Sequence, residues 1–88
     1  MKVEALESFA LDIETVSSPK DRARIVKVVE NIQAAENPFQ IHNLKKLKGA
    51  PSSFRVRVGD YRIGLLIERD TVTLARCLPR KDIYRVFP

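Results

Sequence analysis

Several residue types are too scarce in this chain to build whole classes of site. Its 88 residues include one cysteine, one histidine, three glycines and no tryptophan. A lone cysteine excludes an internal disulfide, fits a reducing cytoplasm, and cannot form a zinc site with a single histidine. The three glycines form neither a glycine-rich phosphate loop nor a nucleophile elbow. No pair of carboxylates stands out for acid–base catalysis.

Long apolar runs are also missing. No stretch approaches the ~20 apolar residues that cross a bilayer. The first five residues, Met1-Lys2-Val3-Glu4-Ala5, lack the apolar core of a signal peptide. The apolar share of 44% and the charged share of 31% are those of a globular protein rather than a disordered tail. We therefore expect one domain over residues 1–88 and a cytoplasmic location.

Positive charge is abundant, and it lies in one half of the chain. The net charge is +5. Residues 1–43 hold five lysines and arginines against seven acidic residues, whereas residues 44–88 hold eleven against four. Such one-sided clustering is typical of a protein that binds a polyanion. The alternative interpretation is a basic surface kept for solubility.

The first half predicts two helices joined by a short turn. Ser8 is a candidate N-cap for the first helix. Ser18 is the N-cap expected for the second, with Pro19 at its first position and Asp21 three residues past the cap. Asn37-Pro38 should end this helix, because the residue before a proline avoids helical backbone. The apolar stripe expected on the second helix consists of Ala23, Ile25, Val26, Val28, Val29, Ile32 and Ala35.

The remaining apolar segments read as strands. A first short strand is predicted over residues 3–6, and three more over residues 54–58, 61–68 and 71–78. Gly59-Asp60 and Arg69-Asp70 are short enough to close tight hairpins. Residues 39–53 form a connecting segment, and residues 80–86 one short helical turn. The predicted fold class is α+β: a small antiparallel sheet of about four strands with a mixed edge, and an N-terminal helical hairpin packed on one face.

Arginines alternate with valines in the strand over residues 54–58, which places the two residue types on opposite faces. A two-residue loop at Gly59-Asp60 would set Arg57 opposite Arg62, and Arg55 opposite Gly64, which has no side chain to block it. Like charges that face each other destabilise a sheet, so the arrangement suits a site where an anion neutralises them. Guanidinium favours phosphate because its planar fork can bind two oxygens. The alternative is that the arginines point separately into solvent.

Arg76 fits this pattern poorly. On a regular strand paired through a two-residue loop, it would share the core face with Val72 and Leu74. Either its side chain reaches solvent at the sheet margin, or a bulge shifts the register. The sequence leaves both explanations open.

The residues after the last strand could close over a phosphate from the side. Arg80, Lys81 and Tyr84 lie in this segment. Tyr84 could stack on an unpaired base or act on a ribose hydroxyl proton, or it could simply anchor the tail. His42 is interpreted as structural or exposed, and Cys77 as a small core or surface residue.

The order of these motifs closely resembles the RelE/ParE superfamily, the toxins of type II toxin–antitoxin pairs. The likeness rests on Lys-Lys-Leu-Lys-Gly at 45–49, Phe-Arg-Val-Arg-Val-Gly-Asp-Tyr-Arg at 54–62, and Arg-Lys-Asp-Ile-Tyr-Arg at 80–85. The helical half agrees in layout and length only. The family's fold is a small antiparallel sheet with an N-terminal strand beside the later ones and a helical hairpin on one face. It agrees with the layout predicted above.

This resemblance implies a function and a set of residues. The RelE branch cleaves messenger RNA in the ribosomal A site without metal, by attack of a ribose 2′-hydroxyl on its own 3′-phosphate. No cofactor is therefore expected. The implied partners are an acidic antitoxin, messenger RNA on the ribosome, and operator DNA bound by the toxin–antitoxin complex. The implied catalytic residues are Arg55, Arg57, Arg62, Arg80 and Tyr84. Further RNA-binding residues are expected to be Lys45, Lys46, Lys48, Lys81 and Arg85.

Two departures from the family pattern bear on the chemistry. Pro79 stands where many relatives have histidine, and Arg55 and Arg57 stand where lysines are common. Two other functions also stay open: a ParE-like inhibitor of DNA gyrase without nuclease activity, and a degenerate nucleic-acid-binding module. The ParE branch generally lacks the full catalytic set, which favours the nuclease.

Overall fold

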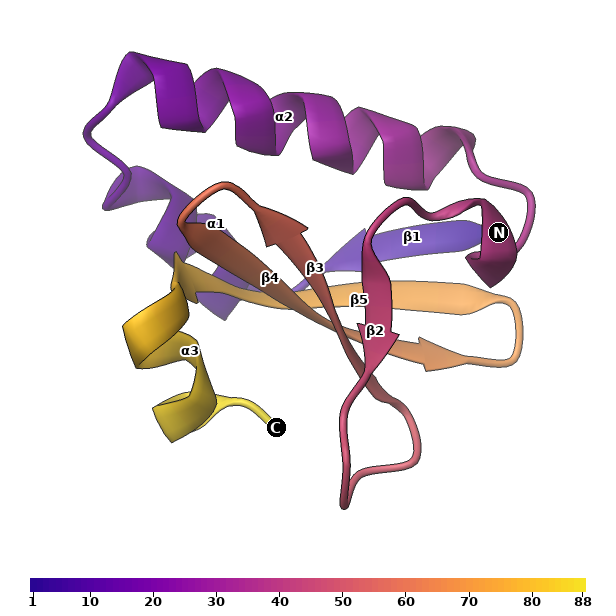
Figure 1. Cartoon of the computed structure of the whole chain (residues 1–88). Helices are drawn as coiled ribbons and strands as arrows, with labels where there is room; N and C mark the ends of the chain where they lie inside the picture. Colours follow the sequence, from indigo (N-terminus) through magenta and orange to yellow (C-terminus); the bar gives the residue numbers. More distant parts are fainter.

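Two helices cover one face of a five-stranded sheet in the computed structural model, which describes all 88 residues (Figure 1). A third, C-terminal helix lies against the other face. None of the helices has the length and apolar character needed to cross a membrane. The elements are β1 (Lys2–Ala5), α1 (Glu7–Glu14), α2 (Pro19–Ala34), the 3-10 helix η1 (Pro38–Gln40), β2 (Leu44–Lys46), β3 (Ser53–Val58), β4 (Tyr61–Glu68), β5 (Thr71–Pro79) and α3 (Arg80–Val86).

The strand order is β1-β5-β4-β3-β2, with β1 parallel to β5 and all other pairs antiparallel. This arrangement confirms the predicted α+β class and its mixed edge. The predicted count of about four strands was one too low, because β2 lies in the segment interpreted as a connection. β2 is only three residues long and carries two lysines, so it has no apolar alternation. Short, charged strands are typical of sheet edges.

Both predicted hairpins are confirmed. Val58 pairs with Tyr61, and Glu68 pairs with Thr71, so each loop has two residues. Gly59 has φ +60, the left-handed conformation that a type II′ turn requires at its first loop position. The register of β3 against β4 follows from this turn.

A bulge in β5 explains the misfit of Arg76. Gly64 pairs with Arg76, but Leu65 pairs with Leu74, so Ala75 is the extra residue. The bulge opens the regular ladder, and α1 supplies the missing hydrogen-bond partners. Ser8 Oγ donates to the Ala75 carbonyl at 2.6 Å, and the Cys77 N–H donates to Asp12 Oδ2 at 2.9 Å.

The prediction that Ser8 caps the first helix was therefore wrong. α1 begins at Glu7 after an N-cap residue, Leu6, that makes no side-chain cap. The Ser8 hydroxyl is instead used in the tertiary contact with β5. Asp12, also on α1, binds the Arg76 guanidinium with both carboxylate oxygens, at 2.7 and 3.1 Å.

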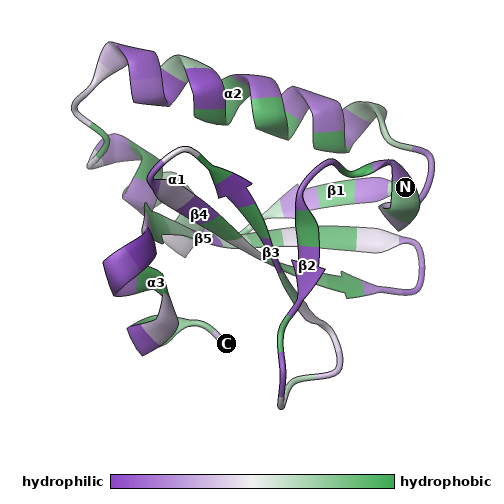
Figure 2. Cartoon of the chain, viewed as in Figure 1, coloured by the Kyte–Doolittle hydropathy of each residue, from purple (hydrophilic) through white to green (hydrophobic).

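The start of α2 is as predicted, but its buried stripe is narrower. Ser18 Oγ accepts from the Asp21 N–H at 3.3 Å, and Pro19 takes the first helical position. Ile25 and Ile32 are buried, whereas Val26 is 50% exposed. One residue turns a helix by about 100°, so Val26 leaves the face that Ile25 occupies. Hydrophobic and hydrophilic residues consequently alternate along α2 (Figure 2). The helix ends at Ala34, before Asn37, which instead caps η1.

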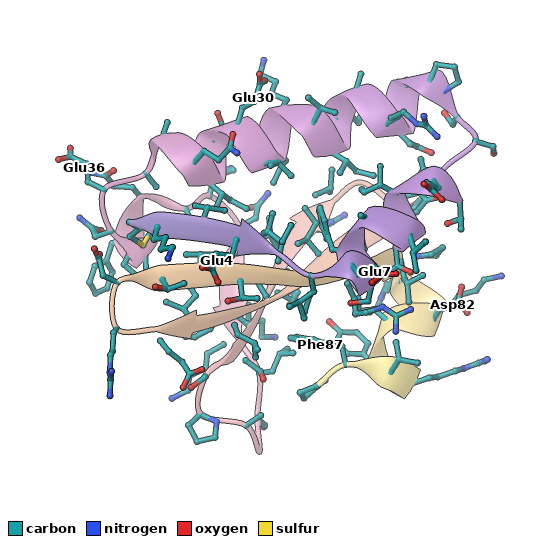
Figure 3. The ribbon with its side chains drawn as sticks, turned by 180° about the vertical axis from the view of Figure 1, so that it is seen from behind. Glu4, Glu7, Glu30, Glu36, Asp82 and Phe87 are labelled. Carbon is teal, nitrogen blue, oxygen red and sulfur yellow. The ribbon has the colours of Figure 1, made fainter.

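Two apolar clusters hold the layers together. Thirteen buried residues form the main core between the helical hairpin and the sheet. A smaller cluster of Ala75, Ile83 and Phe87 packs α3 on the opposite face. At seven residues, α3 is longer than the single turn expected. The space above Gly64 is not open to a ligand, because the Phe87 ring occupies it. Figure 3 shows the Phe87 side chain beside α3.

Gly64→Ala should destabilise the protein by about 1–3 kcal/mol, the usual cost of overpacking. A Cβ at this position would lie 2.6 Å from Phe87 Cδ2, which is closer than two carbon atoms can approach. Urea unfolding measures the loss. Adding Phe87→Leu to Gly64→Ala should recover part of it, because the shorter side chain leaves room for the methyl group. Wild-type stability in the single variant would contradict this packing.

Candidate nucleic-acid interface

β3 and β4 bring three arginines to one face of the sheet. Arg57 lies directly opposite Arg62, and Arg55 opposite Gly64, as the hairpin register predicted. Val56 and Val58, which alternate with the β3 arginines, are buried in the main core. Since successive residues of a strand point to opposite faces, Arg55 and Arg57 lie on the face away from the helical hairpin.

Arg62 is the fixed centre of this group. Only 7% of its surface is exposed, and its Nη1 donates to the carbonyls of Gly59 and Tyr61, both at 2.9 Å. The guanidinium is therefore tied to the β3–β4 turn. Its Nε and Nη2 donate to no group of the chain, which leaves one edge of the planar fork available for an anion.

The pKa of Arg62 reflects the charged groups near it. Its pKa is lowered, first by burial and then by the positive charges of Arg57 and Arg55. The Tyr84 phenol raises this pKa, and Arg80 lowers it further. The four other side chains expected to be catalytic therefore each lie within electrostatic range of Arg62. We refer to Arg55, Arg57, Arg62, Arg80 and Tyr84 as the arginine cluster.

α3 is anchored beside the β3–β4 turn. The Arg80 N–H donates to the Asp60 carbonyl at 2.9 Å, so the start of the helix is held at the tip of the hairpin. A shallow hollow opens between the two. It is lined by Asp60, Pro79, Arg80, Lys81 and Tyr84. Tyr84 is 51% exposed, so its ring can be reached from solvent.

Asp60 was not expected at this site. The residue lines the hollow, yet it was interpreted only as half of a tight turn. Asp60 lies two residues before Arg62 in the sequence, and this proximity could have indicated that it belongs to the site. Asp60 forms no ion pair with the surrounding basic side chains.

No carboxylate neutralises the arginine cluster. The chain has two ion pairs, Lys2 with Glu4 and Arg76 with Asp12. Neither involves a residue of the cluster. Several guanidiniums close together without counter-charges repel one another, and an anionic ligand would relieve that repulsion. The geometry therefore suits the binding of a phosphate.

The lysines of β2 and the following loop are divided between the two faces. Lys45 pairs with Arg55 and so extends the arginine cluster toward the sheet edge. Lys46 pairs with Phe54, which packs against the main core, so this lysine lies on the helix-covered face. Lys48 lies beyond β2 in the loop that leads to β3. Of the three, only Lys45 adjoins the cluster.

The basic side chains of α3 lie on the solvent side of that helix. Lys81 lines the hollow, and Arg85 is exposed one turn further along.

His42 and Cys77 do not belong to this site. His42 is exposed, and Cys77 is buried in the main core. Burial, and then the nearby Asp12 carboxylate, raise the pKa of the Cys77 thiol to about 12, so it stays protonated and unreactive near neutral pH.

Comparisons with known proteins find close relatives over the whole chain, although no family model matches. The chain is 37% identical to toxin RelE3 of Methanocaldococcus jannaschii over 89 aligned positions, which cover 100% of both proteins. It also resembles a chain in the crystal structure of the RelB-RelE antitoxin-toxin complex from Methanococcus jannaschii. There the identity is 34%, the TM-score is 0.79, and the match covers 97% of this chain and 99% of that one.

A more distant structure shows the same fold. A chain of the toxin-antitoxin complex RelBE2 from Mycobacterium tuberculosis superposes with a TM-score of 0.72 at 22% identity, over 90% of this chain and 96% of that one. At that identity the likeness concerns the arrangement of helices and strands alone.

Proposed function

Because this chain belongs to the RelE family of type II toxins, we propose that it is a ribosome-dependent endoribonuclease that cleaves messenger RNA in the A site. The observation that carries the proposal is the arginine cluster. Arg57 faces the buried, hydrogen-bonded Arg62 across the hairpin, the charges of Arg55, Arg80 and Tyr84 also act on it, and no acidic side chain pairs with any of them. A preorganised positive site of this kind stabilises charge that develops on a phosphate.

The chemistry would be an internal transfer at phosphorus. The ribose 2′-oxygen attacks the adjacent 3′-phosphate and loses its proton to a base, while the bond from phosphorus to the 5′-oxygen breaks. The 5′-oxygen takes up a proton from water, so the products are a 2′,3′-cyclic phosphate and a 5′-hydroxyl. Nε and Nη2 of Arg62 would bind two phosphate oxygens, with Arg55 and Arg57 adding positive charge as the transition state forms. Arg80 would stabilise the departing 5′-oxygen. The reaction needs no metal in this scheme.

Proton transfer would contribute less to the cleavage rate than charge stabilisation does. Arginines are poor acids and bases near neutral pH because their pKa exceeds ~12. Pro79 replaces the histidine that many relatives place beside this motif, so no imidazole is available. Tyr84 remains as the group that would act on the 2′ proton, with ribosomal RNA supplying part of the geometry.

Tyr84→Phe should lower the rate of messenger RNA cleavage on ribosomes by ~10²-fold or more, the usual contribution of a general acid or base. The substitution keeps the ring and removes only the hydroxyl. An unchanged rate would instead mean that Tyr84 stacks on a base, and Tyr84→Leu would then be the damaging change.

Expression without antitoxin tests the proposal as a whole. Growth arrest with codon-phased cuts in RNA 5′-end maps is expected. Arrest with intact messenger RNA and inhibited supercoiling would point to DNA gyrase as the target. Absence of arrest would leave a nucleic-acid-binding module without toxic activity.

The proposed inhibitor is an acidic antitoxin segment that folds on the cluster. The uncompensated charge suits such a partner, and the similar chains described above were crystallised in complexes with antitoxins. Further proposed partners are messenger RNA on the ribosome and, for the toxin–antitoxin complex, operator DNA.

A further inference from the structure

One flank of α2 carries a second row of positive charge. Lys20, Arg24 and Lys27 follow at spacings of four and three residues, which places them on one side of a helix. All three are exposed, and none forms an ion pair. At 1.5 Å per residue the row extends over ~10 Å. We call these three residues the α2 row.

The α2 row meets the arginine cluster at the β3–β4 turn. Arg24 Nη1 lies 3.2 Å from where a Cβ of Gly59 would be. The carbonyl of the same glycine accepts from Arg62. Further along this flank, Asn31 and Arg57 line one small hollow of about 50 Å³. Positive charge is therefore continuous from the cluster, around the edge of β3, to α2.

Asp21 and Glu30, the acidic residues of α2, each lie three positions from a member of this row, but neither forms an ion pair with it. Asp21 is half-buried at the start of the helix, where its N–H donates to Ser18. Glu30 lines an apolar groove together with Val26 and Gln33. Figure 3, viewed from behind, shows Glu30 projecting away from the sheet. No carboxylate of α2 thus pairs with a side chain of the row.

The residue types on this flank indicate whether it suits single-stranded or double-helical nucleic acid. Lys20, Arg24, Lys27 and Asn31 include no aromatic side chain on which an unpaired base could stack. Proteins that hold single-stranded nucleic acid combine charge with such stacking, whereas charge along a rigid element suits the backbone of a double helix.

We propose that the α2 row binds the phosphate backbone of double-helical RNA beside the strand held by the arginine cluster. The inference rests on the proposed function, because the ribosome surrounds its messenger RNA with RNA helices. An acidic protein segment would be the alternative ligand for the same three side chains.

A binding measurement that does not depend on cleavage tests the α2 row. The probe is a short 2′-O-methyl RNA duplex, which lacks the 2′-hydroxyl needed for the reaction. Arg24→Gln combined with Lys27→Gln should reduce the slope of log K against log salt by about 2, because two phosphate contacts are lost. The matched control is Lys2→Gln with Arg69→Asn, which removes the same charge elsewhere and respects φ +56 at Arg69. Its slope should equal that of the wild type.

Cleavage on ribosomes separates this inference from the proposed function. The Arg24→Gln/Lys27→Gln variant should raise KM for ribosome-bound messenger RNA about tenfold, as expected for two lost phosphate contacts, and leave kcat unchanged. An unchanged duplex slope, or an equal loss in the control, would overturn the α2 row as an RNA site and leave the nuclease proposal intact. Weakened binding of an acidic antitoxin with unchanged duplex binding would also overturn it.

Discussion

Arg62→Lys is expected to lower the rate of messenger RNA cleavage on ribosomes by ~10²–10³-fold, the usual cost of losing one preorganised donor at a transition state. Lysine keeps the positive charge but has no planar fork. In the wild type, Nη1 is held by the carbonyls of Gly59 and Tyr61, which aims the other nitrogens of Arg62 outward. An ammonium group cannot bind the turn and two phosphate oxygens in this way. Single-turnover cleavage on programmed ribosomes measures the difference.

The matched control for this experiment is Arg69→Lys. Arg69 is exposed in the loop between β4 and β5, far along the strand from the cluster, and should tolerate the change without loss of activity. Lysine is preferred to alanine at position 62 because alanine would also leave two carbonyls of the turn without their donor. A folded Arg62→Lys variant that cleaves at the wild-type rate would contradict the role given to the guanidinium.

Asp12→Ala is expected to reduce the free energy of unfolding by about 2–4 kcal/mol. Asp12 has a side chain only 10% exposed, and it accepts from Arg76 and from the Cys77 N–H. Its loss leaves a partly buried guanidinium and a buried backbone donor without partners. The Arg76 side chain is 29% exposed and can recover some hydration, which keeps the expected loss below that of a fully buried pair. Urea or thermal unfolding provides the measurement.

Two variants calibrate the effect of Asp12. Asp12→Asn keeps an oxygen that can accept from Cys77, so it should lose less stability than the alanine variant. Glu7→Ala removes an exposed carboxylate from the same helix and should change stability by ~0.5 kcal/mol or less. A loss at Asp12 no larger than at Glu7 would mean that the contact between α1 and β5 contributes little.

The register of the β3–β4 hairpin could be predicted from the sequence because two local rules determine it. A two-residue loop fixes which residues pair, and alternation fixes which face each side chain takes. Arg57 opposite Arg62 follows from these rules alone. The bulge at Ala75 was one of two explanations for Arg76, and it could be foreseen because a charged residue fell on the core face.

Contacts between distant segments could not be predicted in the same way. Phe87 over Gly64 and Arg24 beside Gly59 depend on how helices dock on the sheet, and no local pattern reports that. Ser8 has the composition of a cap, but its hydroxyl gains a partner on β5 that the sequence does not reveal. β2 owes its extended conformation to pairing with β3 rather than to its own residues.

β1 pairs with no strand other than β5, and this affects how early during synthesis the fold can form. During synthesis β1 emerges before the other four strands, yet its partner begins only at Thr71. At 5–20 residues per second, the nascent N-terminal strand waits roughly 3–13 s for that partner. Arg80 and Tyr84 follow later still, in α3. The ribosome that makes this protein therefore translates all five strands and α3 before the proposed site can form.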